Sequence, residues 1–299
     1  GTLEVSAVES VVGSADEDAV TMLAAGSLKL SDVETVIGST TLVEVVTLNA
    51  GSLLAVSDIN TVIGQAGVDD SVQMLAGGAL AVSAVDTVTG TTGSTDALTL
   101  LAAGTVTVID IESVTGSAAL AEVVQLGDEG ESLAVNAVDS VIGSTGTTDA
   151  LVLAGGGTLA VSGVESVTGD DASTDVLTLL AAGAVSISSI ETVTGSAGVD
   201  TLRLRSGDAV AISAVESVVG STGADDQVTL LAAGSLKVAA LETLIGSTGA
   251  DAVSLIAAGN LSVSAVETAI GSTASTDAIT LLATGDLAIS AIDTVLGTG

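Results

Sequence analysis

The sequence predicts an all-β fold, a right-handed parallel β-solenoid with about 26 residues in each coil. Three observations favour this fold. A motif close to Val-Glu-Thr-Val-Ile-Gly-Ser-Thr recurs along the chain, at nearly constant intervals of about 26 residues. Each repeat holds three short apolar runs rich in Val, Ile, Leu and Thr, which are typical of strands. The chain contains no Pro, a residue that strands paired on both sides exclude.

One glycine occupies the same position in every repeat, and the series has no gap. These anchoring glycines are Gly13, Gly38, Gly64, Gly90, Gly116, Gly143, Gly169, Gly195, Gly220, Gly246, Gly271 and Gly297. We therefore expect a single continuous solenoid over residues 1–299, made of twelve repeats of which the last is partial. Neither the first nor the last repeat differs from the interior ones, so no capping repeats are expected.

The three runs of one repeat illustrate the expected strands. Around Gly246 they are Leu236–Val238, Leu241–Ile245 and Val253–Ile256, and Gly, Ser, Thr and Asp separate them. This order predicts three short strands per coil, each stacked on its equivalent in the next coil at about 4.8 Å. At one repeat per coil, the chain would form about 11.5 coils. A helical solenoid would need about 33 residues per repeat.

The residue types that are missing exclude several functions. The chain has no Phe, Trp, Tyr, Cys or His, and its 4 Lys and Arg stand against 37 Asp and Glu, a formal net charge of −33. Disulfides, thiolate or imidazole metal sites and nucleophile–histidine pairs are therefore impossible. Four cations cannot neutralise a phosphate backbone, so nucleic acid is not an expected partner. No apolar run approaches the roughly 18–20 residues of a membrane span, so no membrane insertion is expected.

The acids form two columns along the repeats. The first acid column lies four residues before the anchoring glycine, and Asn60 is its only exception. Its members are Glu9, Glu34, Asp86, Glu112, Asp139, Glu165, Glu191, Glu216, Glu242, Glu267 and Asp293. The second acid column lies five or six residues after the glycine. Its members are Asp18, Glu44, Asp70, Asp96, Glu122, Asp149, Asp175, Asp200, Asp226, Asp251 and Asp277.

Stacked coils would bring acids of one column close together. Two carboxylates about 5 Å apart repel by roughly 0.8 kcal/mol even in water. Bound cations or raised pKa values would relieve this repulsion, and a set of oxygen ligands suits Ca²⁺. For the second column we expect Ca²⁺, with a solvated acidic edge or protonated carboxylates as alternatives. For the first column we expect outward acids beside hydroxyls that cap the backbone, with cation binding as the alternative.

The second column also carries a motif. Gly246-Ser247-Thr248-Gly249-Ala250-Asp251 resembles the start of the calcium-binding nonapeptide of RTX (haemolysin-type) repeats, and the loop from Gly195 to Asp200 matches equally well. The resemblance implies carbonyl ligands from Gly195, Gly198, Gly246 and Gly249. It also implies carboxylate ligands from Asp69, Asp200, Asp225 and Asp251. The second Gly of the family motif is absent, usually replaced by Ser, and most loops are one residue longer.

The uniform repeats favour a structural function and no enzymatic one, because a catalytic site is a local irregularity. We expect an extracellular or cell-surface bacterial protein, the building block of a matrix filament, S-layer or adhesin stalk. Its partner would be itself, head to tail or as a continuation of the same solenoid, with calcium as stabiliser. Two alternatives are an RTX-type calcium-dependent module of a larger secreted toxin, protease or adhesin, and an ice-binding solenoid.

Overall fold

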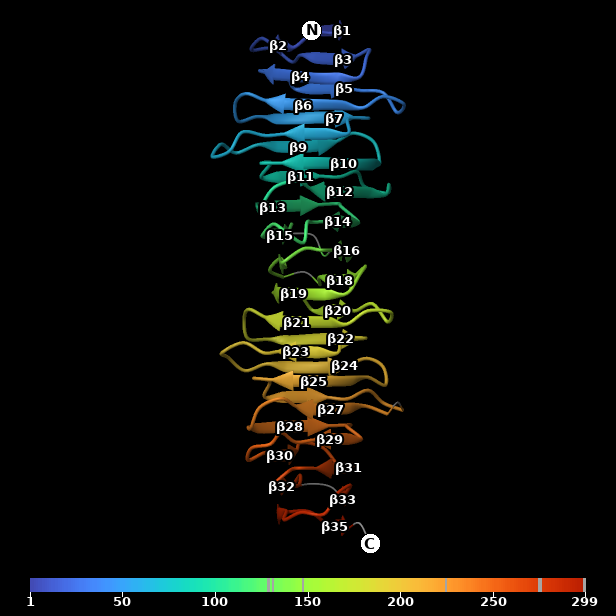
Figure 1. Cartoon of the computed structure of the whole chain (residues 1–299), viewed down its shortest axis with the longest axis vertical. Helices are drawn as coiled ribbons and strands as arrows, with labels where there is room; N and C mark the ends of the chain where they lie inside the picture. Colours follow the sequence, from blue (N-terminus) through green and yellow to red (C-terminus); the bar gives the residue numbers. More distant parts are fainter. Residues whose placement is uncertain (128–129, 131, 147, 224, 274–275, 298–299) are drawn as a thin grey trace. The chain divides into compact units, whose positions relative to one another are not determined.

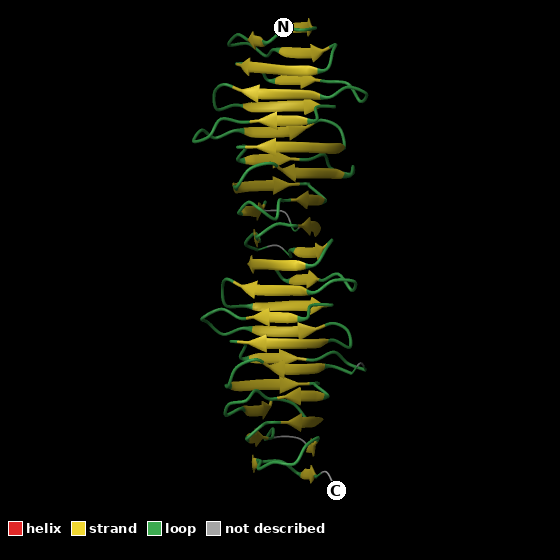
Figure 2. Ribbon diagram, in the orientation of Figure 1, coloured by secondary structure: helices red, strands yellow, loops and turns green. Residues whose placement is uncertain are grey.

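The computed structural model describes residues 1–297 apart from 128–129, 131, 147, 224 and 274–275. In this part of the chain every regular element is a β-strand (Figures 1 and 2). The chain divides into two compact units, Gly1–Asp149 and Ala150–Gly299. Each unit is by itself a solenoid of parallel strands, so the predicted all-β parallel β-solenoid is confirmed.

Unit 1 contains strands β1 to β17. They are β1 (Thr2–Val5), β2 (Ser10–Val12), β3 (Ala19–Met22), β4 (Gly26–Ser31), β5 (Thr35–Ile37), β6 (Glu44–Leu48), β7 (Leu53–Ser57), β8 (Thr61–Ile63), β9 (Ser71–Met74), β10 (Gly78–Ser83), β11 (Thr87–Thr89), β12 (Asp96–Leu100), β13 (Gly104–Ile109), β14 (Ser113–Thr115), β15 (Glu122–Leu126), β16 (Ser132–Asn136) and β17 (Ser140–Ile142).

Unit 2 contains strands β18 to β35. They are β18 (Ala150–Leu153), β19 (Gly157–Ser162), β20 (Ser166–Thr168), β21 (Asp175–Leu179), β22 (Ala184–Ser188), β23 (Thr192–Thr194), β24 (Thr201–Leu204), β25 (Ala209–Ser213), β26 (Ser217–Val219), β27 (Gln227–Leu230), β28 (Ser235–Ala239), β29 (Thr243–Ile245), β30 (Ala252–Leu255), β31 (Gly259–Ser264), β32 (Thr268–Ile270), β33 (Asp277–Leu281), β34 (Ala288–Ser290) and β35 (Thr294–Leu296).

Each unit has two parallel sheets, because a strand pairs with the second strand after it in the chain. Odd-numbered strands form one sheet and even-numbered strands the other. In the odd-numbered sheet of unit 2, for example, Gln227 of β27 pairs with Thr243 of β29. In the even-numbered sheet of unit 1, Ser113 of β14 pairs with Ala134 of β16. One coil therefore has two strands, and the predicted coil of one whole repeat is wrong.

The predicted three strands belong to one repeat but not to one coil. Three strands per repeat and two strands per coil mean that each repeat spans one and a half coils. Consecutive repeats thus begin in opposite sheets. The pattern begins again in the same sheet after every two repeats, which together make three coils. The number of coils also exceeds the predicted value of about 11.5, since nine odd-numbered strands are described in each unit. Handedness and continuity across the two units stay predictions.

The core lies between the two sheets of a unit. In β28, Leu236 and Val238 are buried while Ser235 and Lys237 are exposed. The middle residue of the shortest strand of the repeat is buried as well, as with Val218 and Leu244, both 0% exposed. This alternation follows from the period of two in strands. Small and medium aliphatic side chains fill the space between the sheets.

A residue in the left-handed backbone conformation lies at the turn from one sheet to the other. Ala214 follows β25 with φ of 53°, and β26 begins shortly after it at Ser217. Equivalent residues have the same conformation in other repeats, including Ala240 (φ 50°) and Gly163 (φ 67°). The carbonyl groups of these turns approach the anchoring glycines. A Cβ on Gly246 would lie 1.7 Å from the carbonyl oxygen of Ala265, so only glycine fits there.

Candidate functional site: the acid ladder

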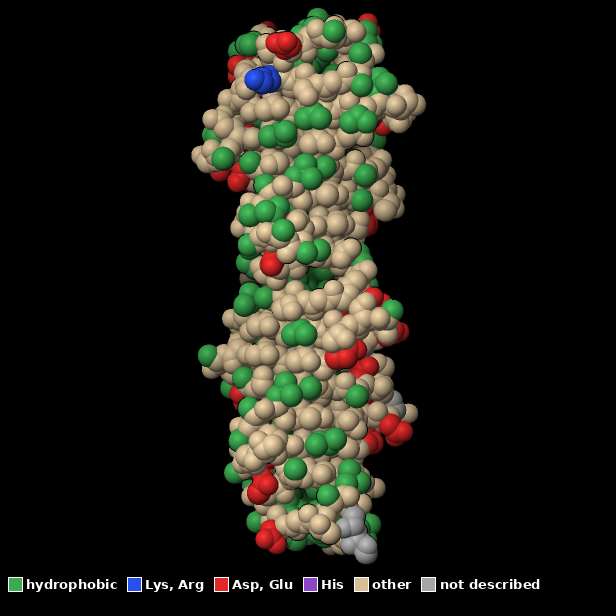
Figure 3. Space-filling model, viewed as in Figure 1, with side chains coloured by type: hydrophobic (Ala, Val, Ile, Leu, Met, Phe, Trp, Pro, Cys, Tyr) green, Lys and Arg blue, Asp and Glu red, His purple; other side chains and the backbone are tan. Residues whose placement is uncertain are grey.

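The second-column acids are almost all buried. Exposed fractions are between 0% and 2% for Glu44, Asp70, Asp96, Glu122, Asp149, Asp175, Asp200, Asp226, Asp251 and Asp277. Asp18 is the more open member, with 19% of its side chain exposed. The acidic side chains that show on the face drawn in Figure 3 are scattered along it and do not gather in one patch. Burial of ionisable groups costs free energy unless hydrogen bonds compensate it.

Asp251 shows how the protein compensates this cost. Its Oδ2 accepts the backbone N–H of Ser247 at 2.5 Å and the hydroxyl of the same residue at 2.8 Å. Its Oδ1 accepts the N–H of Gly234 at 3.0 Å, from the entry of the neighbouring strand β28. The carboxylate therefore closes its own loop and ties it to the preceding coil.

The same contacts recur along both units. The residue after the anchoring glycine donates its N–H to a carboxylate oxygen of the second-column acid at 2.5 to 3.0 Å. The acids bound in this way are Asp18, Asp70, Asp96, Glu122, Asp149, Asp175, Asp200, Asp226, Asp251 and Asp277. A hydroxyl at this position adds a second bond, for example from Ser196, Ser221 and Ser272. This bond gives the hydroxyl after the anchoring glycine a structural role.

Most first-column acids accept a hydrogen bond from the second-column acid of the preceding coil. Glu267 Oε2 accepts the backbone N–H of Asp251 at 2.7 Å, and Asp251 precedes β30 while Glu267 precedes its neighbour β32. Equivalent bonds of 2.6 to 3.0 Å join the pairs Asp18–Glu34, Asp70–Asp86, Asp96–Glu112, Glu122–Asp139, Asp175–Glu191, Asp200–Glu216, Asp226–Glu242 and Asp277–Asp293. We call these paired columns the acid ladder.

Asn60 takes part in the ladder without a charge. Its Oδ1 accepts the N–H of Glu44 at 2.8 Å, the contact that a carboxylate makes elsewhere. The requirement at this position is thus an acceptor oxygen rather than an acid. First-column acids such as Asp86, Glu112 and Glu267 are exposed, as expected, and in addition they accept this bond.

A signal in the sequence reveals the pairing. The second-column acid and the next first-column acid are 16 residues apart in all but one of the pairs named above. The exception is Glu122 and Asp139, where the coil is one residue longer. Loop lengths vary elsewhere in the repeat, so a nearly constant spacing indicates a fixed contact. The shortest coils of the solenoid also contain 16 residues, so this spacing corresponds to one coil.

The glycines of the RTX-like loops have a packing role. A Cβ on Gly249 would lie 2.6 Å from the Cβ of Ala233 in the preceding coil, and one on Gly198 would lie 2.4 Å from that of Ala182. Gly195 resembles Gly246: a Cβ there would lie 1.8 Å from the carbonyl oxygen of Ala214. Close approach of the coils therefore accounts for glycine at all four positions predicted as carbonyl ligands.

Several buried carboxylate oxygens have no hydrogen-bond partner within 3.5 Å among the residues that the structure describes. They are Oε1 and Oε2 of Glu44, Oε2 of Glu122, Oδ1 of Asp175 and Oδ1 of Asp277. Burial raises the pKa of Glu44, Glu122 and Asp175, because removal from water disfavours the charged form.

Neighbouring carboxylates raise these pKa values further. The charge of Asp58 acts on the pKa of Glu44, that of Asp139 on Glu122, and those of Glu191 and Asp170 on Asp175.

Asp18 differs because it faces a cation. The amino group of Gly1 lies 2.7 Å from its Oδ1 and is the main cause that lowers the pKa of Asp18 to about 2. The N–H and hydroxyl of Ser14 lower this pKa further.

The remaining predicted ligands lie outside the ladder. Asp69 and Asp225 are exposed, whereas the adjacent Asp70 and Asp226 are buried. Among the residues that the structure describes, no group of three or more acids is placed to hold a metal ion. Most second-column oxygens already accept N–H donors, and calcium binding at these residues stays a prediction.

Comparisons with protein-family models, with curated proteins and with solved structures returned no match. No helix that could cross a membrane occurs in the described part of the chain.

Proposed function

We propose that this chain is a structural protein, a solenoid segment of an extracellular bacterial filament, surface layer or adhesin stalk. The observation that carries the proposal is the uniformity of the acid ladder. Ten pairs, from Asp18–Glu34 to Asp277–Asp293, make the same bond between neighbouring coils. A polar group used in this way positions the backbone at each coil, whereas catalysis needs one site that differs from the others.

Head-to-tail association with a second copy, or continuation of the same solenoid, stays part of the proposal, and β34 and β35 contain the core positions that such a neighbour would contact. Ile289 is 50% exposed and Val295 39%, whereas the equivalent Val263 and Ala269 are buried to 1% and 0% exposure. A further coil, from the same protein or from a second copy, would cover these side chains and pair the free strand edges. Unpaired strand edges are ready templates for such addition.

Sedimentation velocity and negative-stain microscopy of the 299-residue chain test the proposal. We expect particles longer than one chain, and we expect Val295→Asp to shorten them because a charge would enter the covered core. Thr294→Ser, a neighbouring change without charge, serves as the control. A monodisperse species of 28.4 kDa at all concentrations would refute end-to-end assembly.

Calcium binding stays a separate prediction from the sequence. The oxygens without hydrogen bonds, such as Oδ1 of Asp277, are the places where a cation would displace no N–H donor. A thermal melt with millimolar Ca²⁺ and with EGTA decides this point. A higher melting temperature in Ca²⁺ would support the prediction, and an unchanged one would leave these carboxylates with their structural role alone.

A further inference from the structure

Unit 2 exposes a leucine directly after the third strand of every second repeat. Leu180 follows β21, Leu231 follows β27 and Leu282 follows β33, and they are 54%, 55% and 49% exposed. The residue before the leucine in the middle repeat, Leu230, points into the core. No packing within the unit accounts for a large apolar side chain at these three exposed corners.

The three leucines form one row. Strands β21, β27 and β33 belong to the same sheet, and three successive pairings separate each from the next. At about 4.8 Å per strand, the leucines follow one another at about 14 Å. In the sequence each follows the previous one after two repeats.

A notch lies beside each leucine of the row. The middle notch has a volume of about 180 Å³, and its lining includes Ala214, Val215, Ala232 and Leu236. The notches beside Leu180 and Leu282 have the same construction and volumes of about 200 and 220 Å³.

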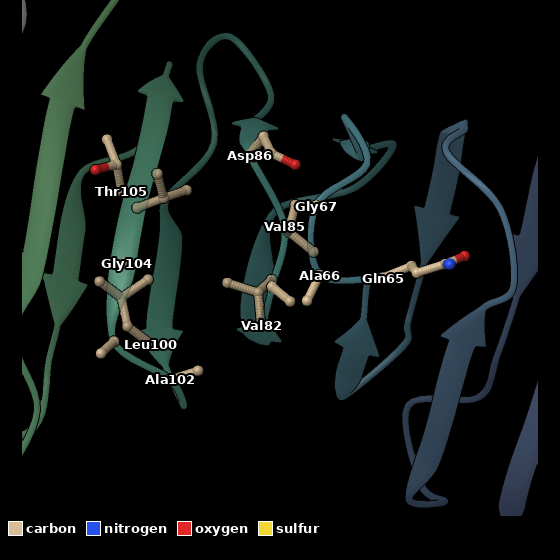
Figure 4. Close-up of a pocket in the computed structure, with 13 residues that line it drawn as sticks. Gln65, Ala66, Gly67, Val82, Val85, Asp86, Leu100, Ala102, Gly104 and Thr105 are labelled. Carbon is tan, nitrogen blue, oxygen red and sulfur yellow. The ribbon is translucent and has the colours of Figure 1, made fainter.

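Unit 1 shows the same design in close-up. Val82, Val85 and Leu100 line a notch there, next to the small corner residues Ala102 and Gly104 (Figure 4). The turn after a first strand and the corner after a third strand thus leave a hollow between them, lined by both apolar side chains and polar groups.

The leucines and the notches match one another in spacing and in size. Gly163, Ala214 and Ala265 each line one notch of unit 2, and they follow one another at the same two-repeat interval as the leucines. A cavity of about 150 Å³ can hold a benzene ring, so each notch has room for a leucine side chain. One chain therefore carries three projections and three hollows with a common period along one edge.

We propose that this edge binds a second copy of the chain laterally, with Leu180, Leu231 and Leu282 of one copy seated in the notches of the other. Such an interface is self-complementary, as in a twofold dimer. It rests on the proposed structural function and adds sideways association to end-to-end growth, which together would produce a bundle or a layer.

The negative charge of the chain makes this contact depend on the salt concentration. The notches also contain first-column acids, including Glu216 and Glu267, whose Oε2 atoms accept N–H donors. Two chains of formal charge −33 repel each other at low ionic strength. Salt shortens the range of this repulsion to about 10 Å at 0.1 M and about 3 Å at 1 M. Lateral association should therefore strengthen with salt.

Sedimentation equilibrium of the full chain in about 0.1 and about 1 M NaCl tests the proposal. Val295→Asp is present throughout, so that end-to-end assembly does not contribute. We expect dimers that tighten with salt. Leu180→Ser, Leu231→Ser and Leu282→Ser together should weaken the dimer at least tenfold, as should filling the notches by Ala181→Met, Ala232→Met and Ala283→Met. The control is Val152→Ser, Val199→Ser and Ile270→Ser, which removes exposed apolar side chains elsewhere in unit 2.

Cross-linking provides a second measurement, since the chain has no Cys. A mixture of Leu231→Cys and Ser235→Cys chains should form mixed disulfides faster than Val199→Cys mixed with Ser235→Cys. An unchanged dissociation constant of the dimer in both triple variants, or equal rates of cross-linking in the two mixtures, would overturn the proposed docking edge. A monomer at the higher salt concentration would overturn it too. That result would leave end-to-end assembly open, because end-to-end assembly is measured with the chain that keeps Val295.

Discussion

The backbone N–H of Asp251 donates to Oε2 of Glu267, 16 residues further along, at 2.7 Å. The carboxylate of Asp251 in turn accepts the N–H of Gly234 from the preceding coil. One residue therefore links three successive strands of a sheet. The bond between Asp251 and Glu267 turns two columns of like charge into a series of contacts between coils.

Removing the acceptor at Glu267 should loosen its coil. Glu267→Ala should cost about 1–3 kcal/mol, because the buried N–H of Asp251 loses its partner. Glu267→Gln should cost less than half as much, since an amide oxygen can accept the same bond, as Asn60 does for Glu44. Amide hydrogen exchange at Asp251 is the specific readout. Equal protection of this amide in wild type and Glu267→Ala would contradict the assignment.

Glu44 should make the protein less stable as the pH rises. Burial and the Asp58 charge raise the pKa of Glu44 in the folded state above its unfolded value of about 4.3. The folded state then binds the proton more tightly, so the stability from this group is complete below a pH of about 4.3. It is lost as the pH rises through the folded-state pKa. Glu44→Gln should therefore flatten the decrease in unfolding free energy that sets in as the pH rises above about 4.3.

Asp251→Asn is the counterpart of this variant. Both oxygens of Asp251 accept N–H donors, so an amide nitrogen would face a donor and cost about 1–3 kcal/mol. Urea denaturation over the same pH series compares the two variants. If Glu44→Gln were the more damaging of the two, the assignment of partners to these carboxyls would be wrong.

Gly246 should tolerate no side chain. Gly246→Ala would place a Cβ 1.7 Å from the Ala265 carbonyl oxygen, which is backbone and cannot move aside without breaking the turn. We expect a loss of about 3 kcal/mol or more, comparable with other severe steric defects. Gly259→Ala is the matched control, because nothing lies within 4 Å of its added Cβ. Similar melting temperatures for the two variants would argue against the close approach.

Ala214 should accept glycine and reject a β-branched residue. Its φ of 53° costs a non-glycine residue about 1–2 kcal/mol. Ala214→Gly relieves this cost but adds flexibility to the unfolded chain, for a net change between about 0 and +1 kcal/mol in stability. Ala214→Val should destabilise by about 2 kcal/mol, because β-branched residues fit this region poorly. Thermal unfolding of both variants beside Gly163→Ala checks the order.

Much of the fold could be predicted because strands have local signals. Alternating Val, Leu and Thr with separating Gly and Asp locates the three strands of a repeat, as around Gly246. The length of a coil has no such signal, since it depends on which strands pair. The acids were recognisable as columns, but the burial of the second column was not, because burial depends on the neighbouring coils. The recurring 16-residue spacing of pairs such as Asp200 and Glu216 indicates the length of the coil but not the burial.

The sequence by itself determined that this protein is an uninterrupted array of stranded repeats, because periodic apolar runs and invariant glycines are local properties of the chain. Only the tertiary structure decided that a coil takes two strands, that a repeat spans one and a half coils, and that the N–H of the buried Asp251 donates to the exposed Glu267. These relationships depend on register between strands, and register is fixed by backbone pairing and close packing over distances that no single repeat contains.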